Sequence, residues 1–377
     1  NEMTLFFRFA ENQLIGVTGT RGKTTTVHWI AHFLSNTLGT QVLPIGNNPK
    51  RPFLKALDGL KKNIPVVLEL PSWQLELISN AKKSPHIALI TNIFPAHLNT
   101  YTSMRKYAEA KANIFKWQTQ NDFLILNYEN EWTKFFLAKK SKARIFYFSS
   151  KGLPARVNGV FVKNDGLIFQ ENGVQKVLGQ INGFERTYGR HNVENMLASV
   201  LAVRLYCPHF KLSKSMIETL PSVPFRQEVI LQSRRLSVVN DSAATTSEAT
   251  IVAMQRFCKK SNWQCVLIAG GTNKNLPYCQ LAKEIKQRIL PKYLILLAGS
   301  ATDVLIKELQ KIGYFNKQEK QEARVYDTLG ECVRAVAGIS VPKKIILFSP
   351  GAASFEKFKN EFDRGEQFNC LAEKYFH

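Results

Sequence analysis

Long apolar runs are missing from this sequence, and so are internal repeats and low-complexity linkers. No stretch approaches the ~20 apolar residues that a membrane-spanning helix needs, so we expect no membrane partner. Hydrophobic residues make up 45% of the chain and charged residues 21%. This balance is typical of a soluble globular protein and excludes a disordered one.

Paired cysteines are also missing. No two cysteines form a CxxC pair, so the spacing predicts neither a zinc site nor a disulfide framework. This usage is best explained by a reducing, cytoplasmic location. The cysteines are Cys207, Cys258, Cys265, Cys279, Cys332 and Cys370.

Acidic residues are scarce relative to basic ones. The chain has 29 Asp and Glu against 51 Lys and Arg, which gives a net charge of +22. This charge favours anionic partners such as nucleic acid, acidic lipid or phosphorylated small molecules. The basic residues are scattered, however, and the cluster Lys139, Lys140 and Lys142 is not interleaved with aromatics. A basic host proteome explains the charge equally well. Since no nucleic-acid motif is present, we expect no nucleic-acid partner.

The length and the hydrophobic pattern predict two or three α/β domains. A chain of 377 residues exceeds one ordinary core. Apolar runs bounded by turn residues alternate with helical periodicity, which indicates a largely parallel sheet. We place a boundary near residues 221–226, where two prolines interrupt the pattern. Because the chain begins at Asn1 and runs almost directly into a strand pattern, we expect a missing N-terminal segment.

Both halves of the chain are expected to contain strands joined by helices. The first half is expected to hold strands at 14–18, 64–70, 86–92 and 123–127, helices at 22–38, 103–117 and 192–206, and short antiparallel strands over 144–178. The second half is expected to hold strands at 236–239, 265–269, 293–297 and 345–348, with helices between them.

A glycine-rich turn between the first strand and the first helix carries the strongest motif. It reads Gly-Val-Thr-Gly-Thr-Arg-Gly-Lys-Thr-Thr-Thr over 16–26. Glycines let backbone amides approach phosphates, and a helix N-terminus favours anions. Lys23 is expected to neutralise β/γ-phosphate charge, and Thr24 to hold Mg²⁺. Strict P-loop spacing has glycine where this chain has Val17, and a turn without function is the weaker alternative.

Three more polar residues of the first half are candidates. Glu69 ends an apolar strand, where a carboxylate faces the ligand crevice of a parallel sheet and is a natural Mg²⁺ ligand. A solvated carboxylate is the alternative there. His97 follows the next strand in a loop, which favours a functional role. Lys111 lies in the middle of a helix and, taken alone, has the pattern of a surface lysine.

Three strand ends of the second half also carry polar residues. They are 240–242 (Asn-Asp-Ser), 270–274 (Gly-Gly-Thr-Asn-Lys) and 349–355 (Ser-Pro-Gly-Ala-Ala-Ser-Phe). Asp, Lys and Ser side chains at such ends suggest a site for a zwitterionic or carboxylate ligand. Each segment alone is a weak signal.

Taken together, these motifs resemble those of the Mur ligase family over nearly the whole chain. The matching segments of the first half are 19–26 (the ATP loop), 69–76 (a magnesium-associated glutamate), 91–98 (a histidine on a second magnesium ion), 107–111 (a carbamylated lysine) and 189–195 (near the nucleotide). In the second half, 225–228 and 240–245 resemble family motifs. Segments 349–355 and 360–368 are most similar to the D-glutamate-adding branch, and they argue against folylpolyglutamate synthases.

The resemblance implies an α/β fold in three parts. Residues 1–12 would be a remnant of the N-terminal domain that grips UDP in the family. Residues 13–223 would form a P-loop-type central ATP-binding domain with a mainly parallel sheet and a small antiparallel β insert. Residues 224–377 would form a Rossmann-like C-terminal domain that binds the amino acid.

The resemblance also implies the role of each candidate residue. The implied catalytic residues are Lys23, Glu69, His97 and Lys111. Two Mg²⁺ ions would be held by Thr24, Glu69, His97 and carbamylated Lys111, since a carbamate supplies the anionic oxygens that Mg²⁺ prefers. The implied nucleotide contacts are Gly19, Thr20, Gly22, Lys23, Thr24, Thr25, Asn195, Arg226 and Asp241. The implied amino-acid contacts are Thr245, Lys274, Ser354 and Phe355.

The implied reaction is ATP-dependent amide formation in peptidoglycan precursor synthesis. ATP would phosphorylate the carboxylate of a UDP-linked muramoyl precursor to an acyl phosphate, which the amine of D-glutamate attacks. The products would be an amide, ADP and phosphate. The implied partners are these small molecules, and we expect a cytoplasmic monomer.

Several positions depart from the family pattern. Ala96 stands where the family has Asp, Phe225 where it has His, Ala243 where it has Lys, and Asn273 where it has Asp. The alternative is therefore a Mur-ligase-like ATP-binding protein that is non-catalytic or altered in specificity. A basic nucleic-acid-binding ATPase is a third hypothesis, which rests on the net charge alone.

Overall fold

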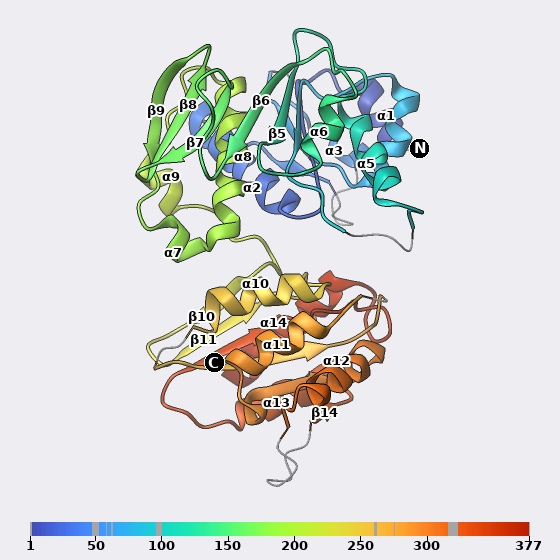
Figure 1. The fold of residues 1–377 in the computed structure, drawn as a ribbon, viewed down its shortest axis with the longest axis vertical. Coiled ribbons are helices and arrows are strands. Elements are labelled where there is room, and N and C mark those ends of the chain that lie inside the picture. The colour runs from blue at the N-terminus through green and yellow to red at the C-terminus, as the bar shows by residue number, and fades with distance from the viewer. Residues whose placement is uncertain are drawn as a thin grey trace. The chain divides into compact units, whose positions relative to one another are not determined.

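The chain folds into two compact α/β units, Asn1–Pro221 and Ser222–His377. The computed structural model describes residues 2–46, 53–57, 59–61, 63–95, 100–259, 262–274, 276–315 and 323–376. Figure 1 shows that each unit is built around its own sheet. None of the helices formed by these residues is long and apolar enough to cross a membrane.

The first unit is built on a nine-stranded sheet in the order β2-β3-β1-β4-β5-β6-β7-β8-β9. All neighbours from β2 to β7 are parallel, and only the β7–β8 and β8–β9 pairs are antiparallel. The strands are β1 (Leu14–Thr18), β2 (Pro44–Ile45), β3 (Val66–Glu69), β4 (Ile87–Ile90), β5 (Phe123–Asn127), β6 (Arg144–Ser149), β7 (Gly159–Lys163), β8 (Gly166–Glu171) and β9 (Val174–Gln180).

Helices cover both faces of this sheet, so its central strands are buried on both sides and mostly apolar. In β1, Ile15 and Val17 belong to the core with α2 and α8, and Leu14 belongs to the core with α1, α4 and α5. Burial on both faces is the pattern expected of a parallel sheet. The helices are α1 (Glu2–Phe9), α2 (Lys23–Leu38), α3 (Phe53–Leu57), α4 (Ser72–Ile78), α5 (Met104–Ala112), α6 (Thr133–Leu137), α7 (Phe184–Tyr188), α8 (Arg190–Tyr206) and α9 (Lys214–Glu218).

The predicted elements of the first half differ from the structure mainly at their ends. The strands expected at 14–18 and 123–127 match β1 and β5 at both bounds, whereas α5 ends at Ala112 and continues as a 3₁₀ turn. Of the strands expected to be antiparallel over 144–178, β7, β8 and β9 are, whereas β6 pairs in parallel with both β5 and β7. Because β6 pairs in parallel with β5, they extend the main sheet instead of forming a separate one.

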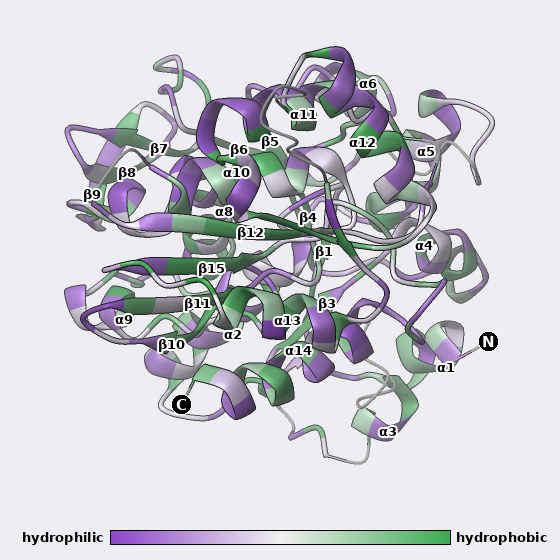
Figure 2. Cartoon of the chain, turned by 90° about the horizontal axis from the view of Figure 1, so that it is seen from below, coloured by the Kyte–Doolittle hydropathy of each residue, from purple (hydrophilic) through white to green (hydrophobic). Residues whose placement is uncertain are grey.

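The second unit has a six-stranded sheet in the order β10-β11-β15-β12-β13-β14, in which only the β10–β11 pair is antiparallel. Its central strands β12 and β15 are strongly hydrophobic (Figure 2). The strands are β10 (Glu228–Gln232), β11 (Leu236–Asn240), β12 (Gln264–Gly270), β13 (Leu294–Leu297), β14 (Arg324–Tyr326) and β15 (Lys344–Phe348). The helices are α10 (Ser247–Phe257), α11 (Cys279–Arg288), α12 (Ser300–Lys311), α13 (Leu329–Ala337) and α14 (Glu361–Phe376).

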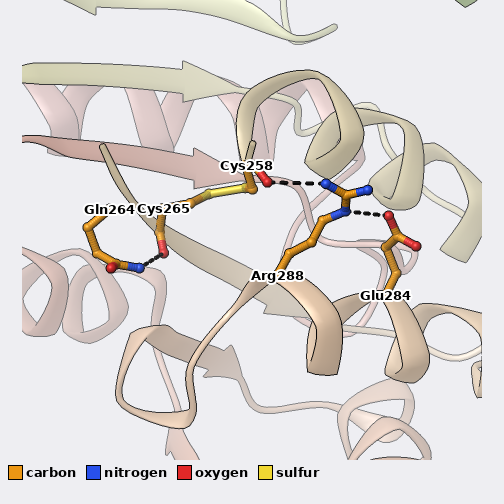
Figure 3. Close-up of a disulfide and its surroundings, with 5 residues drawn as sticks. All are labelled: Cys258, Gln264, Cys265, Glu284 and Arg288. Atoms are coloured by element: carbon orange, nitrogen blue, oxygen red, sulfur yellow. Dashed lines mark hydrogen bonds and ion pairs between the residues drawn. A yellow bond between two sulfur atoms is a disulfide. The ribbon is translucent and has the colours of Figure 1, made fainter. Parts of the chain in front are cut away.

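The structure contains a disulfide between Cys258 and Cys265, so the prediction of no disulfide was wrong. Cys258 ends α10 and Cys265 lies at the start of β12, so the fold brings their Cα atoms to 5.3 Å although no CxxC pair exists. Arg288 donates to the carbonyl of Cys258 at 3.3 Å and also pairs with Glu284 (Figure 3). The disulfide therefore links the end of α10 covalently to the start of β12.

We expect alkylation of the denatured, unreduced protein to modify four cysteines, and six after reduction. The four free cysteines of the structure are Cys207, Cys279, Cys332 and Cys370. Closing a loop of this length stabilises a fold by about 2–3 kcal/mol, so reduction should lower the free energy of unfolding of the second unit by that amount. Cys258→Ser should expose five thiols without reductant. Six reactive thiols in the unreduced wild type would contradict the bond.

Candidate functional site

The glycine-rich turn lies at the carboxyl edge of the first sheet, where β1 ends and α2 begins. Gly22 precedes α2 with a φ of 83°, a left-handed conformation that favours glycine. A Cβ at this position would lie 2.2 Å from Oδ1 of Asn195, a residue of α8. The absence of a side chain therefore lets α8 approach the turn. The structure brings together two segments that the sequence analysis linked only through a common nucleotide.

Two residues that follow β4 hold this turn in shape. The Asn92 side chain accepts from the backbone N of Arg21 (2.9 Å) and donates to the carbonyl of Arg21 (3.2 Å). The Thr91 hydroxyl donates to that carbonyl at 2.7 Å, and the carbonyl of Asn92 accepts from Thr20 N at 2.9 Å. These contacts direct the amides of Thr20 and Arg21 toward Asn92 and so hold the backbone of the turn. The sequence analysis did not single out Asn92, although its position just after an apolar strand was an available signal.

Lys111 is buried directly behind the turn, although its local sequence pattern alone is that of a surface lysine. It is 1% exposed, and its Nζ donates to the carbonyl of Gly19 at 2.9 Å and lies 4.6 Å from the ring centroid of Tyr107. Burial and, next, repulsion by Lys23 hold the pKa of Lys111 well below its ordinary value, although Glu69 opposes the shift. The site therefore shifts this amine toward its neutral, nucleophilic form.

Glu69 and Lys23 lie in the same neighbourhood. Glu69 ends β3, pairs in register with Val17 of β1 and is 8% exposed. Lys23 opens α2 and donates from Nζ to the carbonyl of Thr20 at 3.2 Å. Because both charges act on the pKa of Lys111, the three side chains share one electrostatic site.

Five of the implied nucleotide contacts, Gly22 and Lys23 among them, are partly exposed around this site. Thr20 lies in the turn, and Thr24 and Thr25 lie in the first turn of α2. His97 and the departure at Ala96 lie outside the described residues. The metal ligand implied at His97 therefore stays a prediction from the sequence.

The donors of the first unit fit a magnesium ion held mainly by phosphate. Within the described ranges, no group of three or more His, Cys, Asp or Glu side chains is arranged to hold a metal. Glu69 and Thr24 nonetheless offer a carboxylate and a hydroxyl oxygen. Mg²⁺ is commonly bound by one or two carboxylates, substrate phosphates and waters, so this oxygen set suits it.

In the second unit, the strand order β11-β15-β12 places three motif segments side by side. Thr272 and Ala353 exchange backbone hydrogen bonds of 2.9 and 3.0 Å, and Gly351 N donates to the carbonyl of Ala244 at 2.9 Å. The second contact joins the 349–355 segment to the one that carries Thr245. The fold thus gathers the implied amino-acid contacts at one edge of the sheet.

The side chains at this edge offer donors to a ligand. Ser354 is 2% exposed, and among the described residues its hydroxyl has no hydrogen-bond partner. Lys274 is exposed as a whole residue, although burial lowers the pKa of its amine, and its Nζ lies 5.7 Å from the ring centroid of Phe355. A buried hydroxyl without a partner is costly, so a ligand oxygen beside Lys274 would satisfy it.

Asp241 is buried beneath the segment that carries Arg226. Its carboxylate accepts from the Ser349 hydroxyl at 2.7 Å and from Gln227 N at 3.0 Å. Phe225 and Gln227, on either side of the exposed Arg226, have φ values of 62° and 50°. Asp241 therefore stabilises a left-handed turn that presents Arg226. Both of these hydrogen bonds are internal to the unit, unlike the direct nucleotide contact that the resemblance implies.

Stability of the second unit should fall as the pH rises from about 4 to 7. Burial raises the pKa of Asp241 to about 7, although the hydrogen bonds from Ser349 and Gln227 oppose this. The folded state therefore holds a proton that the unfolded state releases near pH 4, and the loss reaches about 4 kcal/mol at ~1.4 kcal/mol per pKa unit. Hydrogen exchange of β11 amides in wild type and Asp241→Asn, at pH 4.5 and 7.5, measures this loss of stability. If the opening free energies of wild type and Asp241→Asn differ by the same amount at both pH values, the raised pKa of Asp241 is contradicted.

The chain is similar to known proteins along nearly its whole length. The Mur ligase middle domain matches residues 17–203. A UDP-N-acetylmuramoylalanine--D-glutamate ligase from a Roseiflexus species is 32% identical over 99% of this chain and 78% of the relative. The enzyme of that name from Clostridium perfringens is 34% identical over 98% of this chain and 76% of the relative.

Solved structures share the fold at low identity. MurF from Acinetobacter baumannii matches with a TM-score of 0.70 at 16% identity, over 98% of this chain and 79% of that protein. The MurF ligase from Thermotoga maritima in complex with ADP matches with a TM-score of 0.63 at 17% identity, over 99% of this chain and 83% of that protein. Together with the sequence matches, these findings place the chain in the Mur ligase family, whose members are ATP-dependent amide ligases.

Proposed function

We propose that this protein uses ATP to join D-glutamate to UDP-N-acetylmuramoyl-L-alanine. The observation that carries the proposal is the buried Lys111 amine on the carbonyl of Gly19, in one electrostatic site with Lys23 and Glu69. The curated relatives named for D-glutamate addition supply the substrate pair. The oxygen donors of the site suit a phosphoryl transfer, in which charge must be stabilised on the moving group.

The residues of the first unit bind and orient the reacting phosphates. Asn92 holds the amides of Thr20 and Arg21, so the phosphates would meet the backbone amides at the N-terminus of α2, and Lys23 would release the carbonyl of Thr20 to neutralise the γ-phosphoryl charge. Glu69, Thr24 and carbamylated Lys111 would hold magnesium, with His97 as a further ligand. Bound magnesium would supply Lewis-acid stabilisation of the phosphoryl oxygens.

The state of the Lys111 amine supports its carbamylation. A neutral amine attacks carbon dioxide, forms an N–C bond and loses one proton, which gives a carbamate with one negative charge. The low pKa of Lys111 favours the neutral amine that this step needs. The carbamate would reverse the charge of the side chain beside Lys23 and provide two anionic oxygens, the ligands that hard cations prefer.

The second unit would bind the amino acid through Lys274, Ser354, Phe355 and Thr245. Lys274 and the Ser354 hydroxyl are suited to a carboxylate of D-glutamate. The free amine of the bound D-glutamate then attacks the acyl phosphate, and a tetrahedral intermediate collapses to the amide and phosphate. We propose that the protein acts as a cytoplasmic monomer, although the Cys258–Cys265 bond removes the argument for that location from cysteine usage.

The proposal is tested by phosphate release from ATP and Mg²⁺, with and without each substrate. Release that requires both UDP-N-acetylmuramoyl-L-alanine and D-glutamate is the expected result, with the amide product identified by mass spectrometry. Release with another amino acid in place of D-glutamate would refute the proposed acceptor but retain ligase chemistry. Nucleotide binding without release on any substrate would favour the non-catalytic alternative that Ala96 and Ala243 suggested.

A further inference from the structure

Arg364 of α14 is a fully buried cation that binds backbone instead of a carboxylate. It is 0% exposed. Its Nη1 donates to the carbonyls of Ala352 (3.1 Å) and Ala353 (3.0 Å). Its Nε and Nη2 donate to the hydroxyl (3.1 Å) and the carbonyl (2.7 Å) of Ser242. One guanidinium thereby joins the segment after β11 to the segment after β15.

The neighbouring contacts of α14 fix the same segments and a third one. The Ser242 hydroxyl donates to the carbonyl of Glu361 at 2.8 Å, and Asn240 Nδ2 donates to the carbonyl of Gly365 at 2.9 Å. A Cβ on Gly365 would lie 2.3 Å from the Phe225 ring, so this glycine leaves space for the residue just before Arg226. Three motif segments of the second unit therefore meet on one turn of α14.

The guanidinium is placed to act on the ligand site without touching the ligand. A Cβ on Gly271 would lie 3.4 Å from Nη1, so the cation lies behind the strand end that leads to Lys274. The carbonyls it binds, at 352 and 353, directly precede Ser354. Burial lowers the pKa of Arg364 to about 10, so it stays charged at neutral pH. Its potential favours an anion at this edge, since a buried charge is poorly screened.

We infer that Arg364 is a positioning residue for the acceptor amino acid: it fixes Ser354 and the 242–245 segment in the geometry that binds the acceptor carboxylate. This inference takes the identity of the acceptor, D-glutamate, from the proposed function. The positioning role of Arg364 is argued independently of that function. Arg364 should therefore govern acceptor affinity and the rigidity of the two segments, while nucleotide binding by the turn of the first unit is unaffected.

The test compares wild type, Arg364→Lys and the control Glu373→Gln, an exposed position of the same helix. Lysine keeps the charge but cannot reproduce the four hydrogen bonds of the planar guanidinium. In the full chain, we expect Arg364→Lys to raise KM for D-glutamate at least tenfold and to change KM for ATP less than twofold. Hydrogen exchange of the amides at 242–245 and 352–355 should accelerate at least tenfold, with the melting temperature of the control unchanged.

The outcomes separate the inference from the proposed function. Unchanged exchange and unchanged KM for D-glutamate in folded Arg364→Lys would overturn the inference. If the wild type shows no D-glutamate-dependent release, the proposed function fails, and the exchange measurement still decides the positioning role. If Arg364→Lys does not fold, Ser242→Ala removes one acceptor of the cluster. That variant should raise KM for D-glutamate about threefold, and no change in either readout would again overturn the inference.

Discussion

Replacing Lys111 by alanine is expected to lower kcat by at least about 10³-fold, which corresponds to ~4 kcal/mol of lost transition-state stabilisation. The variant loses the amine that is carbamylated in our proposal, and with it two anionic oxygens beside Lys23 and Glu69. A small residue also leaves a cavity where short carboxylates fit. Acetate or propionate at high concentration should therefore restore part of the activity, as measured by phosphate release.

The matched control for this prediction is Lys116→Ala, which removes an exposed lysine shortly after α5. Its kcat should stay within twofold of wild type. Removal of carbon dioxide and bicarbonate should lower wild-type activity reversibly and leave the alanine variant unchanged. Wild-type kcat in Lys111→Ala would refute the carbamate, and a low kcat without rescue by any carboxylate would reduce Lys111 to a packing role.

The phosphate turn could be predicted from the sequence because its chemistry is local. Gly19, Gly22 and Lys23 follow one another within five residues, and a strand pattern and a helix pattern flank them. The conformation needed there depends on glycine, which the sequence states directly. The strand ends of the second unit were visible for a similar reason, since each is a polar segment that directly follows an apolar run.

Lys111 and Arg364 could not be recognised as buried charges from local pattern. Lys111 lies in a helix of low mean hydropathy and Arg364 in the first turn of another. Each is buried because segments distant in sequence close over it: β1 and its turn over Lys111, and the segments after β11 and β15 over Arg364. Their hydrogen-bond acceptors are mostly backbone carbonyls, which any residue provides. Only the resemblance pointed to Lys111, and nothing in the sequence analysis pointed to the buried contacts of Arg364.

The disulfide and β14 were missed for a different reason. Cys258 and Cys265 can be joined only because the fold brings the end of α10 close to the start of β12. β14 has only three residues, none of them buried, so it lacks the apolar run by which strands are recognised. Both features depend on the assembled sheet.

Replacing Lys23 by methionine is expected to lower kcat by at least about 10³-fold, because the transferred phosphoryl group loses the cation that neutralises its developing charge. Methionine keeps the length and the apolar stem of the side chain. ADP binding, measured by calorimetry, should weaken by only about tenfold, since the turn held by Asn92 and the backbone amides at the start of α2 remain. Lys23→Arg should recover little of the rate, because a planar guanidinium does not replace a compact ammonium in this turn.

The Lys23 variant also tests whether the two lysines are coupled. Repulsion by Lys23 lowers the pKa of Lys111, so its loss should raise that pKa and reduce the neutral amine available to carbon dioxide. A ¹³C carbamate signal from labelled bicarbonate should then be weaker in Lys23→Met at neutral pH and should return as the pH or the bicarbonate concentration rises. Turnover should not return with it, because the phosphoryl group still lacks its cation. Recovery of turnover along with the signal would mean that Lys23 serves the carbamate and not the phosphoryl transfer.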